Sequence, residues 1–397
     1  MYTRRRFLIG AGAVGLTSVA GCLGDFEIYY TGQEQPQTKW WPQPQFDGLA
    51  TSYNPKQVGP RTGVSERWTL DISGPAARPV VADGLAFLPT IDAVRAVDAR
   101  TGKEQWRESG DGPPLWPQAV LWNDGRLYVA QTQSPGLIAL DAATGKRQWQ
   151  FDADQSGISA LVIDSESSEL FAGDDKGNIY KLDPVTGEQR WHHQFFGPIS
   201  TFAIGARPFL LVGTEGGEVY AVSRIDGRGY WRRKFPGQIS ALATMDGSYN
   251  GAGAFVSVFG GPTFGINPDQ TGTSVWETDV SGVESFVVAG RRVFAAGQRL
   301  VSLDLGSGKQ QWSGGKTSQC GPAAAGETVY AASESKVSAY KSGGGTGIGN
   351  VRLATKRWSY SVEGRPQQGL AVADGAVFVL TEKSENTTPK AYALEEA

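Results

Sequence analysis

The sequence predicts an all-β protein, an eight-bladed β-propeller with four short antiparallel strands in each blade. Three observations lead to this prediction. A unit of the form Ala-x-Asp-x-x-Thr-Gly-x-x-x-Trp recurs along the chain. Its tryptophans follow one another at intervals of 36 to 46 residues, which match the ~40–50-residue blades of propellers. A further hairpin pattern precedes the copies, so each period holds four strands.

The recurring unit is clearest at residues 139–149, ALDAATGKRQW. An apolar strand ends at the Asp, whose carboxylate can accept hydrogen bonds from the N–H groups of the turn. The Gly supplies the positive φ that other residues resist, and the next strand carries the Trp. Close copies lie at 96–106, 181–191 and 302–312, and looser ones at 221–231 and 265–276. The tryptophans expected at equivalent positions are Trp68, Trp106, Trp149, Trp191, Trp231, Trp276, Trp312 and Trp358.

The propeller is expected to occupy residues 64–397 and to close by pairing its two ends. The domain begins with what reads as the last strand of a blade, and the chain finishes with the three strands that this blade lacks. Pairing them leaves no free interior edge, which removes a site of aggregation. Seven blades are then continuous and one is shared. The seventh carries a glycine-rich insertion at 341–350, which indicates a flexible surface loop.

Residues 1–21 read as an export signal. Arg4 and Arg5, followed by Phe-Leu and a short apolar run, resemble a twin-arginine signal. Val19-Ala20-Gly21-Cys22 resembles a lipobox, which implies cleavage before Cys22 and lipidation of its sulfur. The alternative is an uncleaved anchor helix, although the run is short for a membrane span. Either reading predicts an extracytoplasmic protein tethered to a membrane, at the cell surface or in a periplasm.

Residues 22–63 are polar and proline-dotted, without sustained periodicity, and we interpret them as a tether. Trp40 and Trp41 are unusual in a free linker. Because tryptophan has a large apolar area, we expect the pair to pack on the side of the domain. A hook that binds a partner is the alternative.

Composition excludes several classes of function. A repeat array of 397 residues is expected to form one closed domain, since each blade buries its faces only against its neighbours. The net charge of −3 makes nucleic acid an improbable partner. His192 and His193 are neighbours on a predicted strand, where they point to opposite faces, so we expect no metal site there. We expect a monomeric propeller.

The repeated unit resembles the tryptophan-docking motif of the pyrroloquinoline quinone (PQQ) propellers, with the quinoprotein alcohol dehydrogenase-like fold, over residues 65–397. The resemblance implies that the eight tryptophans are structural, each wedged between its own blade and the next. One group of this family, the quinoprotein dehydrogenases, holds the quinone at the axis with Ca²⁺, carboxylate and amide ligands and a catalytic Asp. Many alcohol-oxidising members add a disulfide between adjacent cysteines. The other group is the outer-membrane assembly lipoprotein BamB, which has no cofactor and binds partners through its loops.

This chain has the lipoprotein-like signal and the compact length of the second group. Its only cysteine besides Cys22 is Cys320, so no disulfide between adjacent cysteines is possible. We therefore expect a lipid-anchored protein-interaction scaffold without catalytic residues, cofactor or metal, whose protein partner the sequence leaves open. The alternatives are a dehydrogenase with an atypical site for PQQ and Ca²⁺, and an extracellular glycan or solute receptor. In an organism without an outer membrane, the barrel-assembly role would not transfer.

The loops that lead into the inner strands are expected to line a funnel at the axis, the candidate binding surface. Their mixed charge and many amides favour a peptide or another polar surface over a tight cofactor pocket, although solvated rim residues are an equally simple interpretation. The candidate residues are Arg78, Trp116, Gln118, Gln238, Glu284, Gln319, Arg365 and Gln367.

Overall fold

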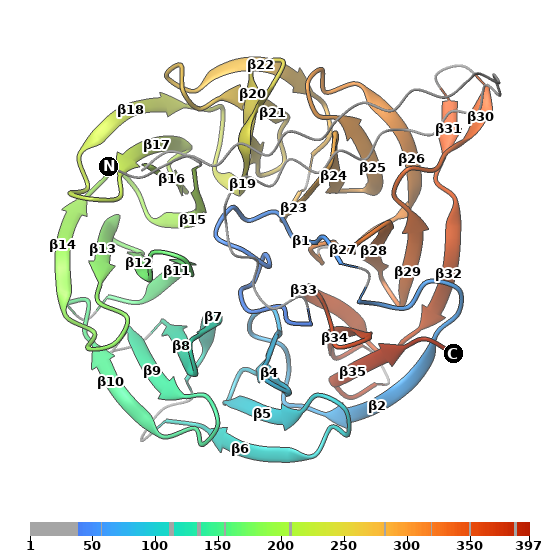
Figure 1. The fold of residues 1–397 in the computed structure, drawn as a ribbon, viewed down its shortest axis with the longest axis horizontal. Helices are drawn as coiled ribbons and strands as arrows, with labels where there is room; N and C mark the ends of the chain where they lie inside the picture. Colours follow the sequence, from blue (N-terminus) through green and yellow to red (C-terminus); the bar gives the residue numbers. More distant parts are fainter. Residues whose placement is uncertain are drawn as a thin grey trace, which may run out of the picture.

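The computed structural model describes residues 39–397 except 57, 111–114, 133–135, 155, 206–208, 282, 319, 349–350 and 385–386. Its strands form eight sheets arranged as blades around one axis (Figure 1). Within the described residues, no helix is long and apolar enough to cross a membrane. The prediction of an all-β, eight-bladed propeller is confirmed.

Each blade has four antiparallel strands that follow one another from the axis outward. Blade 1 contains β3 (Val80–Ala82), β4 (Leu85–Pro89), β5 (Val94–Asp98) and β6 (Glu104–Glu108). Blade 2 contains β7 (Pro117–Asn123), β8 (Arg126–Gln131), β9 (Leu137–Asp141) and β10 (Arg147–Phe151). Blade 3 contains β11 (Ile158–Asp164), β12 (Glu169–Asp174), β13 (Asn178–Leu182) and β14 (Gln189–Gln194). Blade 4 contains β15 (Ile199–Ile204), β16 (Phe209–Thr214), β17 (Glu218–Ser223) and β18 (Gly229–Lys234).

The second half of the ring follows the same order. Blade 5 contains β19 (Ile239–Tyr249), β20 (Ala252–Val258), β21 (Thr263–Asn267) and β22 (Thr273–Thr278). Blade 6 contains β23 (Phe286–Ala289), β24 (Arg292–Ala296), β25 (Arg299–Asp304) and β26 (Gln310–Lys316). Blade 7 contains β27 (Ala323–Ala325), β28 (Thr328–Ser333), β29 (Lys336–Lys341) and β32 (Lys356–Ser361). Blade 8 contains β33 (Arg365–Ala373), β34 (Ala376–Glu382), β35 (Lys390–Glu395) and β2 (Ser65–Asp71).

Burial explains the sequence pattern of the strands. A middle strand such as β16 is buried at every position, because it packs against neighbouring blades on both faces. An outer strand such as β14 or β18 alternates between exposed and half-buried residues, since one of its faces meets solvent. The hydrophobic core therefore lies between the blades.

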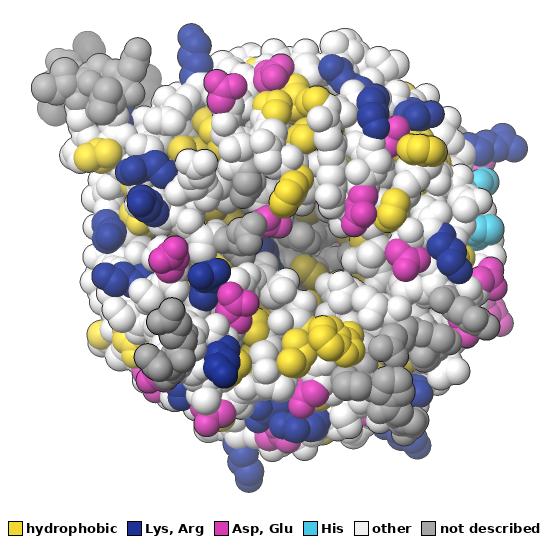
Figure 2. Space-filling view, turned by 180° about the vertical axis from the view of Figure 1, so that it is seen from behind, with side chains coloured by type: hydrophobic (Ala, Val, Ile, Leu, Met, Phe, Trp, Pro, Cys, Tyr) yellow, Lys and Arg dark blue, Asp and Glu magenta, His cyan; other side chains and the backbone are white. Residues whose placement is uncertain are grey.

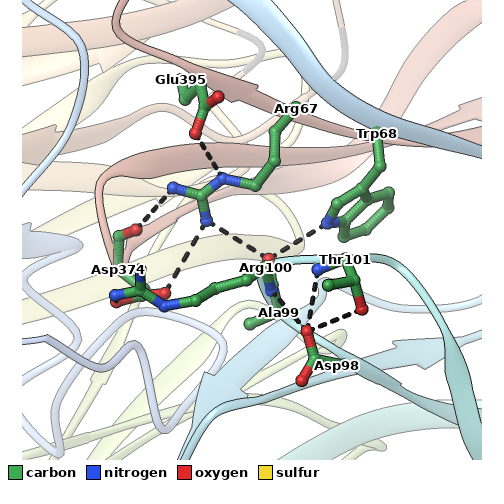
Figure 3. A network of polar contacts seen from close by, with 8 residues as sticks. All are labelled: Arg67, Trp68, Asp98, Ala99, Arg100, Thr101, Asp374 and Glu395. Carbon is green, nitrogen blue, oxygen red and sulfur yellow. Dashed lines mark hydrogen bonds and ion pairs between the residues drawn. The ribbon is translucent and has the colours of Figure 1, made fainter.

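The recurring unit joins each blade to the next, as Figure 3 shows for blades 8 and 1. The Trp68 indole N–H donates to the Ala99 carbonyl at 3.0 Å. Asp98 accepts hydrogen bonds from the Thr101 backbone N–H at 2.8 Å and from its hydroxyl at 2.9 Å. Gly102 has a φ of 71°, and a Cβ there would lie 2.9 Å from the Trp68 ring. The turn therefore needs glycine both for its backbone conformation and for the space that the indole fills.

The other seven tryptophans make the equivalent hydrogen bond. Each indole N–H donates to the backbone carbonyl of the second residue of the turn in the next blade. The donor and acceptor pairs are Trp106 and Ala142, Trp149 and Pro184, Trp191 and Arg224, Trp231 and Pro268, Trp276 and Leu305, Trp312 and Ser342, and Trp358 and Pro60. Each tryptophan thus spans a boundary between two blades.

The two chain ends rebuild this turn where the ring closes. β2 pairs with β35 in blade 8, with Trp68 opposite Ala393. The Glu396 carboxylate accepts hydrogen bonds from the backbone N–H of Thr62 at 2.9 Å, from the Thr62 hydroxyl and from the backbone N–H of Arg61. Glu396 thereby takes the part that Asp98 plays before Thr-Gly in blade 1, so the repeat unit is complete although its halves lie at opposite ends of the sequence.

The glycine-rich insertion does not form the flexible loop that the sequence predicts. Strands β30 (Thr346–Ile348) and β31 (Val351–Leu353) make a hairpin. β31 then pairs with β26, and the Ala354 N–H donates to the Ser313 carbonyl at 2.8 Å. The insertion leaves blade 7 but extends the sheet of blade 6 to six strands, because the outer edge of β26 offers unpaired backbone groups.

Candidate functional site

Residues 39–54 form an axial plug, drawn in blue at the centre of Figure 1. The plug lies where the innermost strands end and makes a hydrogen bond to each blade. Seven of the blades each donate one backbone N–H to a plug carbonyl. The donor and acceptor pairs are Asp374 and Lys39, Val81 and Trp41, Trp122 and Pro42, Ile204 and Gly48, Thr244 and Leu49, Val288 and Thr51, and Ala324 and Ser52. Blade 3 is held by the Gln43 side chain, which accepts from the Ile163 N–H at 3.2 Å and donates to its carbonyl at 3.0 Å.

The plug satisfies backbone groups that would otherwise face an empty axis. The innermost strand of a blade has no neighbour on its axial side, so its N–H groups need acceptors from elsewhere. An irregular segment can supply these acceptors in eight directions, whereas a regular strand cannot. The cost is visible in the positive φ values of Phe46, Ala50 and Ser52, at 75°, 59° and 46°. One short strand, β1 (Tyr53–Asn54), pairs in parallel with β27.

The plug corrects the prediction of a tether for residues 39–54. Trp41 is fully buried and packs against Phe46 with ring centroids 5.2 Å apart. Trp40 contacts the edge of Trp122 at 4.7 Å. The tryptophan pair therefore packs on the propeller, but at the axis and not on the side. Residues 1–38, with Arg4, Arg5 and Cys22, lie outside the described residues.

A cavity of about 200 Å³ lies between the plug and the beginnings of the innermost strands. We call the face onto which it opens the cavity face and the opposite side the plug face. Figure 2 shows the molecule from behind the view of Figure 1, hollowed at its centre and with hydrophobic side chains around the hollow. The lining residues are Gln43, Pro44, Gln45, Asp47, Ala50, Ala77, Arg78, Gln118, Ala119, Ser159, Ala160, Leu161, Val162, Ser200, Thr201, Phe202, Glu284 and Gln368.

Arg78 fixes the plug through hydrogen bonds to neutral groups. It is buried and donates from Nη1 to the Pro44 carbonyl at 2.8 Å and from Nη2 to the Ser285 hydroxyl at 2.8 Å. Burial lowers the pKa of its guanidinium to about 10, because no carboxylate among the described residues pairs with it. Arg78 therefore connects blade 1, the plug and blade 6.

Asp47 holds a turn of the plug on the floor of the cavity. Its carboxylate accepts from the Thr51 N–H at 2.9 Å and from the Thr51 hydroxyl at 2.7 Å. Burial nevertheless raises the pKa of Asp47 from 3.8 to about 6. The loss of water around the charge thus outweighs the hydrogen bonds that stabilise it.

The raised pKa of Asp47 predicts a pH-dependent stability that Asp47→Asn removes. The folded state binds this proton more tightly than the unfolded state, so the stabilisation is complete below the unfolded pKa of 3.8 and is lost as the pH rises through about 6. Denaturant titrations from about pH 3.5 to 7 should show wild type losing stability relative to the variant across this window. Parallel curves for the two proteins would contradict the assignment.

The remaining candidates divide into two sets. Gln118 and Glu284 line the cavity, and Trp116 is 46% exposed on the cavity face, where its carbonyl accepts from the Gln118 amide. Arg365 and Gln367 instead contact Glu382 at 3.7 Å and 2.9 Å. Neither these two nor Gln238 lines the cavity, and Gln319 lies outside the described residues.

The plug residues Gln43, Gln45 and Asp47 and the wall residues Ser200 and Gln368 also line the cavity, although the sequence does not single them out. The plug residues lie in a segment whose composition is that of a linker, and no local pattern marks their contacts. Gln368 has a φ of 67° beside Gly369, in an irregular part of β33 where the register shifts. That bulge turns it towards the axis.

The described residues hold no group of three or more His, Cys, Asp or Glu side chains placed to bind a metal ion. His192 contacts the Asn178 side chain at 3.2 Å, and His193 contacts the Asp226 carbonyl at 2.9 Å. Cys320 is buried, and burial raises the pKa of its thiol to about 12. A thiol in this state is a weak nucleophile at neutral pH.

Comparisons with known proteins agree on the architecture. A solved structure of a computationally designed protein, Ika8, is 16% identical with a TM-score of 0.64, covering 84% of this chain and 100% of its own. BamB from Moraxella catarrhalis is 13% identical with a TM-score of 0.65, covering 84% and 97%. Quinohemoprotein alcohol dehydrogenase ADHIIG from Pseudomonas putida HK5 is 13% identical with a TM-score of 0.65, covering 90% and 80%. At these identities the likeness shows the fold alone.

Sequence comparisons identify the family. No curated protein sequence matches the chain. The family model described as outer membrane protein assembly factor BamB matches residues 91–198, 175–250 and 255–391, which together span most of the propeller. The chain therefore belongs to the BamB family of PQQ-repeat β-propellers.

Proposed function

We propose that the protein is a non-catalytic interaction scaffold, held at the outer face of a membrane by a lipid on Cys22. The axial plug is the observation that carries this proposal, because it fills the axis on one face and leaves a cavity of only about 200 Å³ beside it. The surface that remains for binding is formed by loops. BamB itself is an outer membrane protein assembly factor, which is consistent with a role in binding other proteins.

The path of the plug would set the orientation of the propeller on the membrane. Lys39, the first described residue, lies beside Asp374 in the turn between β33 and β34, on the plug face. A lipid on Cys22 would therefore pull on the plug face, through a segment that spans at most ~60 Å when fully extended. The cavity face would point away from the membrane, towards soluble partners or soluble domains of membrane proteins.

The residues at the axis do not fit a site for PQQ and Ca²⁺. The cavity of about 200 Å³ is smaller than the ~300–1,000 Å³ of sites for drug-sized ligands. Two carboxylates line it, those of Asp47 and Glu284, and both oxygens of Asp47 are occupied by Thr51. We therefore favour the scaffold over the dehydrogenase. A glycan or solute receptor would require a ligand that fits the same small cavity.

Photo-crosslinking in intact cells tests the proposal. A crosslinking amino acid at Trp116 or Phe196, both exposed on the cavity face, should capture a defined protein partner. The controls are Val185 and Ile225, which are 57% and 72% exposed in turns of the plug face. Capture of the same partner from cavity-face positions alone supports the scaffold. Absence of any specific product from the cavity face, or equal products from both faces, would contradict it.

A further inference from the structure

We propose that the axial cavity binds a cationic group, an ammonium or a guanidinium, with the Glu284 carboxylate as its counter-charge. This inference rests on the proposed function, since it names the chemistry of a partner that docks on the cavity face. It is carried by a half-buried carboxylate and a buried hydroxyl that have no partner among the described residues and that line the same open cavity.

Glu284 is the main observation. It lies two residues before β23 and faces the cavity, half-buried. Its carboxylate makes no ion pair or hydrogen bond with any described residue, and burial raises its pKa. A lone carboxylate removed from water is unfavourable unless a cation or hydrogen-bond donors compensate it. A bound ammonium or guanidinium would supply both the opposite charge and the hydrogen-bond donors.

Three further polar side chains line the cavity without a hydrogen-bond partner among the described residues. The Ser200 hydroxyl is buried without a hydrogen-bond partner among the described residues. Gln45, half-buried, and Gln368, exposed, also line the cavity, and their side-chain amides make no hydrogen bond within the described part of the chain. An unsatisfied buried polar group such as the Ser200 hydroxyl is rare in native proteins, so its presence in the same cavity as Glu284 points to a bound molecule that carries donors.

The charge of this molecule follows from which charged group at the cavity remains free to bind it. Arg78 lines the cavity, but its Nη groups already donate hydrogen bonds to Pro44, Ser52 and Ser285. Its guanidinium is therefore not free to bind an anion through two parallel hydrogen bonds. Glu284 is an acceptor only, whereas the open amides and the Ser200 hydroxyl can both accept and donate, so the carboxylate decides the charge of the ligand. An ammonium or guanidinium provides several donors and a charge opposite to that of Glu284.

Size and surroundings fit the end of a basic side chain. The cavity of about 200 Å³ is smaller than the ~300–1,000 Å³ typical for drug-sized ligands. On the same face, Trp116, Phe196 and Phe259 are 46%, 65% and 59% exposed. None of the three lines the cavity, but exposed rings on this face can contact the aliphatic stems of basic side chains on a docked partner. The group could come from a partner's side chain or from a free amine.

The test uses the full chain and three probes: the peptide acetyl-Gly-Lys-Gly-amide, its norleucine counterpart and the diamine cadaverine. Ligand-observed NMR titration gives the Kd of each. Glu284→Gln removes the charge and keeps the shape, and a thermal melt checks its fold. Glu334→Gln is the matched control, because Glu334 is exposed in the loop between β28 and β29 on the same face.

We expect wild type and Glu334→Gln to bind the lysine peptide, the norleucine peptide not to bind, and Glu284→Gln to bind at least about tenfold more weakly. Tighter binding of the peptide than of cadaverine identifies a partner's side chain as the source, and the reverse identifies a free amine. Equal binding of lysine and norleucine peptides to wild type, no binding of either cation, or unchanged binding by Glu284→Gln would overturn the inference. If Glu284→Gln still captures the crosslinked partner while the cations fail to bind, the inference fails and the scaffold stands.

Discussion

Replacing Trp41 by alanine is expected to lower the free energy of unfolding by ~3–5 kcal/mol, the range for truncating a fully buried tryptophan. Trp41 is 0% exposed, and its backbone pairs with Val81 at 2.7 and 2.9 Å. It also packs against Phe46 inside the plug. Loss of the indole leaves a void in the plug and in blade 1 together, so neither can relax independently. Denaturant unfolding, followed by circular dichroism, measures the effect.

The adjacent tryptophan provides the control for this prediction. Trp40 is half-buried and contacts the edge of one ring, that of Trp122. Trp40→Ala should therefore cost distinctly less than Trp41→Ala. Equal losses for the two variants, or no loss for Trp41→Ala, would show that the plug does not contribute to the stability of the propeller.

The second large effect is expected at the boundary of blades 6 and 7. Trp312→Ala should also cost ~3–5 kcal/mol, because Trp312 is 1% exposed and a large cavity would remain. Its indole N–H donates to the Ser342 carbonyl at 3.3 Å, and its ring lies 5.6 Å from that of Phe294. The variant therefore loses packing within blade 6 and a hydrogen bond to blade 7.

A neighbour on the same strand separates docking from general disturbance of β26. Gln310 is exposed, and Gln310→Ala should change the free energy of unfolding by less than ~0.5 kcal/mol. Thermal melts of both variants measure the difference. If Trp312→Ala melts at the wild-type temperature, the tryptophan does not hold the two blades together.

The sequence predicts the blades well because each unit carries its own local signals. Asp98, Thr101 and Gly102 form a turn from neighbouring residues, and the spacing of Trp68 and its equivalents follows directly from the length of a blade. The closing of the ring is also predictable, since three strands at one end match one strand at the other. The role of Glu396 as the missing turn carboxylate is not, because it lies more than three hundred residues from Thr62.

The plug could not be predicted because its contacts are backbone hydrogen bonds over long sequence distances. Such contacts leave no periodicity in the sequence, and any segment with free carbonyls and the right length can make them. The position of Arg78 depends on the plug as well as on blade 1. Glycines at 321 and 369 leave its guanidinium room, since a Cβ at either position would clash with it. The sequence thus predicts a funnel and its loops, while the floor of the cavity becomes known only from the structure.

Hydrogen exchange tests the central claim most directly, namely that residues 39–54 are an integral part of the propeller and fill its axis. Mass spectrometry on peptides covering the plug should show protection comparable to that of an inner strand such as β11, because plug N–H groups are themselves hydrogen-bond donors within a segment that every blade holds in place. These donors are the N–H groups of Trp41, Phe46, Asp47, Ala50, Thr51 and Ser52. Complete exchange of the plug at the earliest times, while β11 remains protected, would contradict the claim and return this segment to the role of a solvated tether.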